Sequence, residues 1–313
     1  MTTDLIFLAL GSVGLYFGAE WLVRGASGLA RAMGVSRLAV GLTVVAYGTS
    51  MPELVVSLVS AVDGKSALAL GNVMGSNIAN LGVILGLTAI ISPPNVQAGL
   101  MRRELPTVLL TLGVLPLVLW NGVIGRVEGA ALLLGAIAFT RVTLKAVTPS
   151  GAPKHTDTEP PPRHSRPALA AFVVLGLALL LGGGKLFVDG AVGLALRFGM
   201  SERLVGLTVV AVGTSLPELA ASLVAALRGE SEIAVGNVLG SNIFNVLLIL
   251  GVTALAHPIE GSLAAVRFDL VAMAALTGVA VVSMRTARRI QRVEGAVLVA
   301  GYAAFLIALA VKG

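Results

Sequence analysis

Residues 41–54 read GLTVVAYGTSMPEL, and residues 206–219 read GLTVVAVGTSLPEL. Each stretch places a glutamate, Glu53 or Glu218, directly after a proline in the middle of a long apolar segment. Proline cannot donate a backbone hydrogen bond, so a helix that contains it opens at the preceding turn and frees carbonyl oxygens there. A carboxylate is costly inside an apolar helix. Because the same costly arrangement occurs once in each half of the chain, it predicts an internal duplication with a polar site in each copy.

The composition is that of an integral membrane protein. Of 313 residues, 56% are hydrophobic and 12% are charged, whereas a soluble domain has about 25% charged residues. Apolar runs of about 20 residues, the length that crosses a bilayer, recur along the chain, and the alternating pattern of a membrane barrel is absent. We therefore predict an all-α membrane protein with about ten transmembrane helices. The predicted spans are Thr3–Ala30, Leu38–Val62, Ala67–Ile91, Leu105–Trp120, Val127–Val147, Ala168–Arg197, Leu204–Leu227, Ile233–His257, Phe268–Met284 and Val293–Val311.

A Pro-rich and charged segment, residues 148–167, interrupts the apolar pattern and predicts a linker between two units, residues 1–147 and 168–313. The numbering offset that relates Glu53 to Glu218 also relates Ser76 to Ser241 and Asn80 to Asn245, and no gap is needed between residues 36 and 88. We call this difference in residue number, which relates Glu53 to Glu218, the repeat offset. Each unit holds five predicted helices. Because five is odd, the second repeat enters the membrane inverted relative to the first, as in many secondary transporters.

Basic residues predict the orientation. Fourteen Lys and Arg residues lie on the side that the chain reaches after odd-numbered spans, and six lie on the other side. Cytoplasmic loops of membrane proteins carry the excess of positive charge. We therefore expect a multi-pass protein of the plasma (inner) membrane, with the linker in the cytoplasm and both termini on the extracytoplasmic side. The N-terminal sequence MTTDLIFLAL has no positively charged region and starts an apolar run too long for a signal peptide, so it is expected to be the first span.

The repeated motifs bring oxygen atoms together. Thr49, Ser50 and Glu53 project from one side of the opened turn, and Ser76 and Asn80 share one face of the next helix, within GNVMGSNIANLGVILG. The second repeat supplies Thr214, Ser215, Glu218, Ser241 and Asn245. This set has no His or Cys, which suits hard cations such as Ca²⁺ rather than zinc or copper. Two carboxylates neutralise one divalent ion, and two or three Na⁺ ions or protons could replace it.

Other classes of partner and site are expected to be absent. The chain has no cysteine, which excludes disulfides, thiolate metal sites and thiol nucleophiles. Its net charge of +6 comes from basic residues at helix ends, which suits lipid headgroups better than nucleic acid. We expect membrane lipid and the transported cations as partners, with no nucleic acid, no obligatory protein partner and no cofactor.

Several polar and small residues have structural interpretations. A single Ser or Thr in a membrane helix usually bonds its own helix, although duplication of the whole set favours function. Two GxxxG spacings, at Gly71 and Gly75 and at Gly236 and Gly240, predict close helix packing. Two charged pairs at i,i+4, Glu20 with Arg24 and Lys185 with Asp189, are interpreted as self-paired, and their signs are exchanged between the repeats.

These motifs resemble those of the sodium/calcium exchanger family, within the cation/calcium antiporters, over nearly the whole chain. The resemblance implies ten helices, with spans two, three, seven and eight forming a core and spans one and six moving against it. It implies that Glu53 and Glu218 bind calcium and also Na⁺, and that Asn80 and Asn245 complete a central polar layer. Further oxygens would come from Thr49, Ser50, Ser76, Thr214, Ser215 and Ser241 and from the carbonyls of Ala46 and Ala211. Several relatives carry an aspartate where this chain has Asn245, so this site has one carboxylate fewer than potassium-dependent exchangers.

The leading functional prediction is a secondary antiporter, not an enzyme, that exchanges Ca²⁺ for Na⁺ at a shared midplane site. The first alternative is H⁺/Ca²⁺ exchange, because burial makes a carboxyl group take up a proton more readily. A cation channel would use similar oxygens, but an internal two-fold repeat favours alternating access. An intramembrane hydrolase using Ser50 or Ser215 is the weakest alternative, because no His or Lys lies near either motif to act as base.

Overall fold

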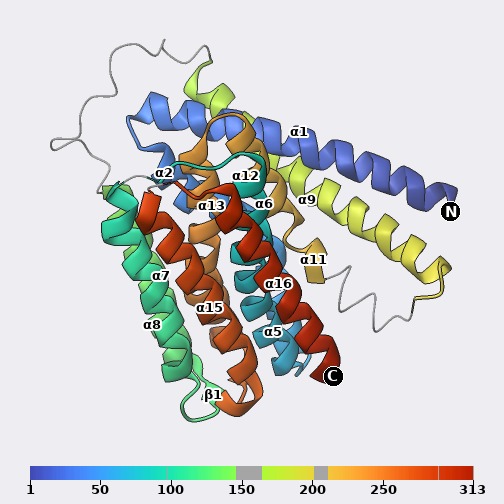
Figure 1. Cartoon of the computed structure of the whole chain (residues 1–313), viewed down its shortest axis with the longest axis vertical. Helices are drawn as coiled ribbons and strands as arrows, with labels where there is room; N and C mark the ends of the chain where they lie inside the picture. Colours follow the sequence, from blue (N-terminus) through green and yellow to red (C-terminus); the bar gives the residue numbers. More distant parts are fainter. Residues whose placement is uncertain (97, 146–163, 201–210, 288, 313) are drawn as a thin grey trace.

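A computed structural model describes residues 1–96, 98–145, 164–200, 211–287 and 289–312, which are helical apart from one short two-stranded sheet and the connections (Figure 1). The elements of the first half are α1 (Thr2–Met33), α2 (Arg37–Val40), η1 (Gly41–Val45), α3 (Ala46–Thr49), α4 (Met51–Val62), α5 (Ser66–Ala79), η2 (Asn80–Leu85), α6 (Gly86–Ile91), α7 (Ala98–Val118), β1 (Val123–Ile124) and α8 (Arg126–Lys145). Those of the second half are α9 (Arg166–Arg197), α11 (Ala211–Gly213), α12 (Leu216–Leu227), α13 (Ser231–Phe244), η4 (Asn245–Ile249), α14 (Leu250–Ala256), β2 (Ile259–Glu260), α15 (Leu263–Ala287) and α16 (Arg292–Lys312). The η segments are π-helical turns that continue their neighbouring α-helices.

Seven helices of the described ranges are long and apolar enough to cross a membrane, and a bent helix pair, Arg37–Thr49 with Met51–Val62, raises that number to eight. This confirms a multi-pass helical membrane protein. The predicted span Leu105–Trp120 is helical within α7 but carries Pro106 and Pro116 and is not one of the seven. The predicted span Leu204–Leu227 lies partly outside the described residues, so the number ten remains a prediction.

The second repeat begins with α9, close to the end of the predicted linker. Residues 148–163 lie outside the described residues, but α9 already begins at Arg166, before the predicted start of the second unit at Ala168. Pro167 occupies the first turn of this helix, and Ser165 precedes it. Proline is well accommodated there, because the first N–H groups of a helix have no partner inside the helix. Pro167 therefore lies in the first turn of α9.

The two central segments are α5–η2–α6 and α13–η4–α14. In the most apolar part of each segment, 72% of the residues are buried in Ser66–Ile91 and 83% in Ser231–Ala256. The corresponding share in the outer helix Arg292–Val311 is 11%. Large apolar side chains such as Leu117 and Leu134 are exposed on the outer helices. The outer helices thus present an apolar surface to the lipid, and the two motif-bearing segments form the core.

α1 and α9 form an antiparallel pair that lies at a steep angle across the bundle formed by α7, α8, α15 and α16 (Figure 1). Glycines allow their backbones to touch: a Cβ atom at Gly176 would lie 2.5 Å from Leu22 N, and one at Gly183 would lie 2.7 Å from Leu15 N. Such small-residue contacts are how membrane helices pack closely. Arg197 Nε lies 2.7 Å from Asp4 Oδ2, so an ion pair also joins the two helices near the α1 N-terminus.

The GxxxG prediction is confirmed in the second repeat. Gly236 and Gly240 pack against α2 and η1, and a Cβ atom at Gly240 would lie 2.6 Å from Leu42 O. The equivalent surface for Gly71 and Gly75 falls on residues 203–211, most of which lie outside the described residues, so that contact stays a prediction.

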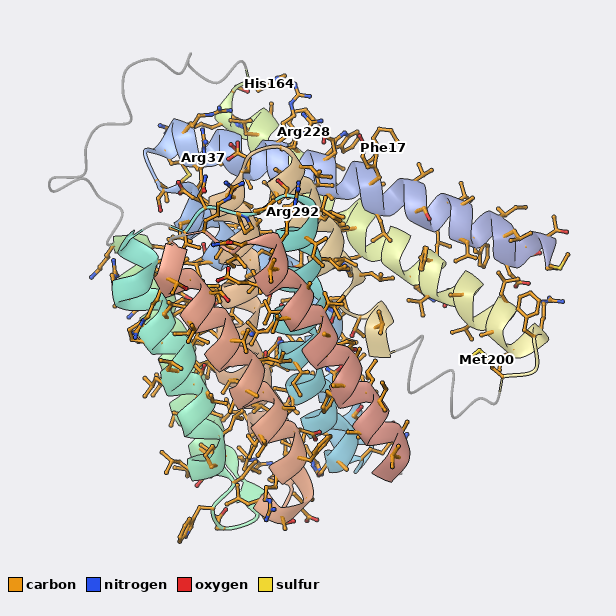
Figure 2. All side chains as sticks on the ribbon, viewed as in Figure 1. Phe17, Arg37, His164, Met200, Arg228 and Arg292 are labelled. Carbon is orange, nitrogen blue, oxygen red and sulfur yellow. The ribbon has the colours of Figure 1, made fainter. Side chains whose placement is uncertain are left out.

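The molecule has two distinct ends. At one, a short sheet pairs β1 with β2, matching Val123 with Glu260, and so joins the α7–α8 and α14–α15 connections (Figure 1). At the other lie Arg37, His164, Arg228 and Arg292 (Figure 2). The three arginines belong to the set that predicts the cytoplasmic side, and α9 starts at this end. We call it the linker-side end.

Candidate cation site

The site is built on two helix breaks. Ser50 separates α3 from α4 with φ −82° and ψ 9°, and Ser215 precedes α12 with φ −88° and ψ 7°. Pro52 and Pro217 occupy the first turns that follow, and the helix bends by 46° at Ser50. The predicted opening of the turn beside each proline is therefore confirmed.

Glu53 and Glu218 lie in the first turns of α4 and α12, and each is 1% exposed. A helix N-terminus carries a partial positive charge that favours a carboxylate there. Each carboxylate also accepts a hydrogen bond from the other repeat: Ser50 Oγ donates to Glu218 Oε1 at 3.0 Å, and Ser215 Oγ donates to Glu53 Oε1 at 3.1 Å. The two duplicated motifs thus meet and complete each other's polar environment.

Asparagines form a second cross-repeat layer. Asn80 Nδ2 donates to Asn242 Oδ1, and Asn245 Nδ2 donates to Asn77 Oδ1, both at 3.0 Å. Asn80 and Asn245 each begin a π-helical turn, η2 or η4. Such turns are frequent at functional sites, because the wider turn shifts the following side chains relative to a regular helix.

Four buried oxygen atoms of these residues have no hydrogen-bond partner among the residues that the structure describes: Glu53 Oε2, Glu218 Oε2, Asn80 Oδ1 and Asn245 Oδ1. Leaving a buried acceptor unpaired costs about 1–3 kcal/mol, and a buried charge costs more. Two anionic and two neutral oxygens are the type of ligand that Ca²⁺ and Na⁺ accept. The described residues contain no group of three or more His, Cys, Asp or Glu side chains, so any ion bound here relies on two carboxylates and neutral oxygens.

The remaining predicted residues lie in the same region. Ser241 Oγ is 3.0 Å from Ser50 Oγ, and Ser76 is buried on α5, one turn before Asn80. Thr49 is fully buried, and its hydroxyl lies 3.1 Å from both Val45 O and Asn237 Oδ1. A hydroxyl has one proton, so Thr49 bonds either its own helix or α13 at any moment.

The two backbone carbonyls that the resemblance implied differ in their bonding. The Ala46 carbonyl accepts from Ser50 N at 3.1 Å, which leaves one of its two lone pairs for another partner. Ala211 begins α11, and there Ser215 N donates to the Val212 carbonyl at 3.2 Å instead. The backbone at the two breaks is therefore similar but not identical.

The sequence analysis missed two asparagines that donate hydrogen bonds to the backbone carbonyls of the glutamates. Asn72 Nδ2 donates to the Glu53 carbonyl at 3.0 Å, and Asn237 Nδ2 donates to the Glu218 carbonyl at 3.3 Å. Each of these asparagines also donates to a serine of the glutamate's own helix, Ser57 at 2.8 Å or Ser222 at 2.9 Å. Both asparagines lie in the GN-x-x-GSN motif and are related by the repeat offset, so the repeat itself contained the signal.

A pocket of about 160 Å³ lies between α9 and the two helix breaks. Its lining includes Pro52, Pro217 and Thr214 beside the glutamates, and Lys185 and Asp189 of α9. Thr214 is half-buried, whereas the equivalent Thr49 is fully buried. The pocket therefore reaches the two helix breaks from the α9 side.

One predicted charged pair is confirmed and the other is wrong. Lys185 Nζ lies 2.7 Å from Asp189 Oδ2. Glu20, however, pairs with Arg228 at the end of α12, and Arg24 lies 2.8 Å from His164 Nε2 and over the Phe172 ring. The reason is tertiary: α1 packs along α12, which brings Arg228 to Glu20.

The family model described as sodium/calcium exchanger protein matches the chain over two segments, residues 3–145 and 168–311. CaxA of Alkalimonas amylolytica is 42% identical over 310 residues, which cover 96% of this chain and 97% of that protein. The sodium/calcium exchanger MaX1 of Methanosarcina acetivorans is 31% identical in an alignment of 346 positions that covers 99% of this chain and 99% of that protein. A solved structure of the sodium-calcium exchanger NCX_Mj superposes with a TM-score of 0.86 at 31% identity and covers 98% of this chain and 99% of its own. The chain therefore belongs to the sodium/calcium exchanger family of membrane antiporters.

Proposed function

We propose that this protein is a secondary antiporter that exchanges Ca²⁺ for Na⁺ at one shared site between its two repeats. The observation that carries the proposal is the set of four buried oxygens that have no partner within the described part of the chain, two from the glutamates and two from the asparagines. A bound cation would supply the missing interaction and offset the charge of two carboxylates. One Ca²⁺ or two Na⁺ ions neutralise the same pair of carboxylates, so the ions compete for it.

The proposed ligands come equally from both repeats. Glu53 and Glu218 are the charged ligands for Ca²⁺. The other proposed contributors are Thr49, Ser50, Ser76, Asn80, Thr214, Ser215, Ser241 and Asn245 and the carbonyls of Ala46 and Ala211. Membrane lipid and the transported cations are the proposed partners, and no cofactor is needed, because the ion gradient itself supplies the driving force.

The proposed architecture is ten helices in two inverted repeats of five, residues 1–147 and 168–313. The protein would lie in the plasma (inner) membrane of the cell, with the linker on the cytoplasmic side. Two observations support the duplication: the family model matches two segments, and the Ser50–Glu218 and Ser215–Glu53 bonds are related by the repeat offset. Inversion would let the site face either side in turn, with both termini outside.

The nearest alternative is exchange of Ca²⁺ for protons at the same carboxylates. Both glutamates are nearly fully buried and have an oxygen without a partner, which a proton would satisfy as a cation would. A channel would use similar oxygens but would show no stimulation of flux by Na⁺ on the opposite side.

Flux of ⁴⁵Ca²⁺ into proteoliposomes tests the proposal. An outward Na⁺ gradient at fixed pH should drive Ca²⁺ uptake, and replacing internal Na⁺ by choline should abolish it; adding K⁺ should not be required. Glu53→Gln and Glu218→Gln should each abolish uptake, while Glu260→Gln, which alters an exposed carboxylate on β2, should not change it. Uptake that ignores the Na⁺ gradient and follows a pH gradient would replace Na⁺ by H⁺ in the mechanism, and unchanged flux in both Gln variants would refute the site.

A further inference from the structure

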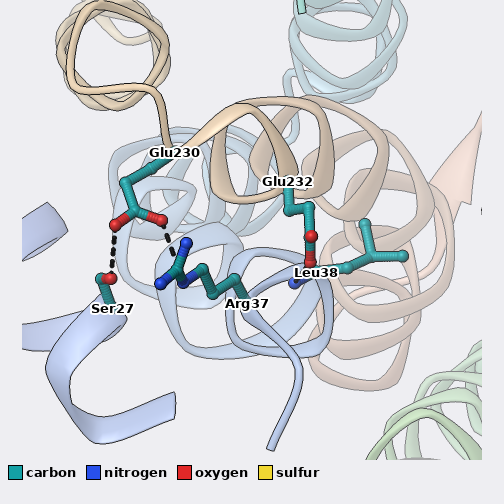
Figure 3. A network of polar contacts seen from close by, with 5 residues as sticks. All are labelled: Ser27, Arg37, Leu38, Glu230 and Glu232. Carbon is teal, nitrogen blue, oxygen red and sulfur yellow. Dashed lines mark hydrogen bonds and ion pairs between the residues drawn. The ribbon is translucent and has the colours of Figure 1, made fainter. Parts of the chain in front are cut away.

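At the linker-side end, charged residues form ion pairs and hydrogen bonds that connect α1 to the core. Glu20 of α1 forms an ion pair with Arg228, the residue that directly follows α12. Just after it, Glu230 Oε2 lies 3.3 Å from Arg37 Nε, and its other oxygen accepts a hydrogen bond from Ser27 of α1 (Figure 3). Glu232 in turn accepts a bond from the Leu38 N–H at 3.2 Å. The short α12–α13 connection is thus tied to α1 and α2 by polar contacts.

The repeat-related positions carry the opposite charges. By the repeat offset, Glu20 corresponds to Lys185 of α9, and Arg228 corresponds to Asp63 at the end of α4. The exchange of signs affects both partners, so Lys185 and Asp63 remain complementary. An acid–base pair on one side therefore corresponds to a base–acid pair on the other.

The second pair is open in this structure. Lys185 instead bonds Asp189 on its own helix at 2.7 Å, and Asp63 bonds Lys65 at 3.3 Å. The Lys185 and Asp63 side chains are 76% and 51% exposed. Both local pairs are exposed, so burial does not hold Lys185 or Asp63 to its present partner.

Helix packing shows the same asymmetry. α1 packs along α12, whereas among the described residues α9 makes no comparable contact with α4. The pocket of about 160 Å³ lies between α9 and the two breaks, with Lys185 in its lining and Thr214 half-buried at its wall. Since α9 starts at the linker-side end, Lys185 and Asp189 belong to its second half, and the pocket that they line lies away from that end.

We propose that Lys185 and Asp63 form an ion pair that closes the α9 side when the carrier changes its orientation, and that the Glu20–Arg228 pair, closed here, opens in that state. The proposal rests on the alternating-access function proposed above, and it makes Lys185 and Asp63 positioning residues that do not touch the ion. In an inverted repeat each conformation exchanges the environments of equivalent residues, so the contact made now by Glu20 is the one that Lys185 makes next.

Because the chain has no cysteine, cross-linking can test the two pairs in the full-length protein. Glu20→Cys with Arg228→Cys and Asp63→Cys with Lys185→Cys should each cross-link under oxidation, and each cross-link should block transport until it is reduced. The two should be mutually exclusive: conditions that raise the yield of one should lower that of the other. Asp63→Cys with Arg197→Cys, at the far end of α9, is the control and should give no cross-link.

Charge reversal supplies a second readout. Lys185→Asp and Asp63→Lys should each lower the maximal rate by about fivefold at an unchanged half-saturating Ca²⁺ concentration, and the double variant should restore the rate. Absence of the 63–185 cross-link in protein that transports, or no restoration in the double variant, would overturn the proposal. Cross-links that form and exchange in response to another ion would instead leave these pairs intact and overturn Ca²⁺/Na⁺ exchange.

Discussion

At the scale of single residues, each glutamate is fixed from two directions. The carboxylate of Glu218 accepts a bond from Ser50 of the other repeat, and its backbone carbonyl accepts one from Asn237 of the neighbouring helix. The bond from Ser50 leaves the second oxygen of the carboxylate available for an ion. The bond from Asn237 fixes the position of the Glu218 backbone. Affinity and position are thus controlled by different residues.

Asn237→Ala separates these two contributions. It removes the hydrogen bonds that Asn237 donates to the Glu218 carbonyl and to the Ser222 hydroxyl, both in a buried setting, which should destabilise the protein by about 1–3 kcal/mol. Thermal unfolding in detergent should show a lower melting temperature, and the half-saturating Ca²⁺ concentration should rise. Asn121→Ala, which changes an exposed turn residue, is the control and should alter neither. An unchanged melting temperature in Asn237→Ala would contradict the positioning role.

Asn245→Asp adds a third carboxylate to the site. Asn245 is 1% exposed and its Oδ1 has no partner, so a negative charge there would attract Ca²⁺ more strongly than the amide does. We expect the half-saturating Ca²⁺ concentration to fall by about tenfold and the maximal rate to fall as well, because one more monovalent cation is then needed to neutralise the site for the return step. Flux with and without K⁺ measures both effects. A weaker apparent Ca²⁺ affinity in this variant would argue that Asn245 does not face the ion.

At the scale of helices, glycine determines how closely α1 and α9 approach. Gly183 faces α1 so closely that a Cβ atom would lie 2.7 Å from Leu15 N, whereas Gly182, the preceding residue, has no heavy atom of the described residues within 4 Å of its Cβ position. These two neighbouring glycines of α9 therefore have different roles. Sequence alone could not separate them, because the difference depends on which face of α9 meets α1.

Gly183→Ala and Gly182→Ala form a matched pair. Overpacking at Gly183 should destabilise the α1–α9 pair by about 1–3 kcal/mol. At Gly182 the same substitution should be neutral or stabilising by up to about 1 kcal/mol, because alanine favours a helix over glycine. Melting temperatures in detergent compare the two. Equal effects would show that the α1–α9 contact does not depend on backbone proximity.

The elements that sequence predicted well are those with a local signal. Apolar length predicted the helices, and Pro52 and Pro217 predicted the breaks, because both are properties of a short segment. The partner of Glu20 was wrong because i,i+4 spacing offered Arg24, whereas α12 brings Arg228 from the other half of the chain. The cross-repeat bonds of Ser50 and Ser215 likewise depend on tertiary structure, although the duplication predicted that the two motifs act together.

At the scale of the whole molecule, the two repeats have nearly the same motif but different surroundings. Thr49 is 0% exposed, whereas Thr214 is half-buried and lines the pocket beside α9. A perfectly symmetric pair of repeats would bury both equally and leave the site closed to both sides. Because of this asymmetry, the two sides of the site differ in accessibility in this conformation.

Single cysteines can measure this difference in accessibility across the membrane. Thr214→Cys should react with a membrane-impermeant thiol reagent added on the side opposite the linker, because its pocket is open there, while Thr49→Cys should resist the reagent from both sides in this conformation. Since the chain has no cysteine of its own, background labelling should be absent. Saturating Ca²⁺ should slow the reaction at position 214, because the ion occupies the adjacent site. Labelling of Thr214→Cys only from the cytoplasmic side would reverse the orientation predicted from the basic residues, whereas equal labelling of both variants from one side would show that the repeats do not alternate.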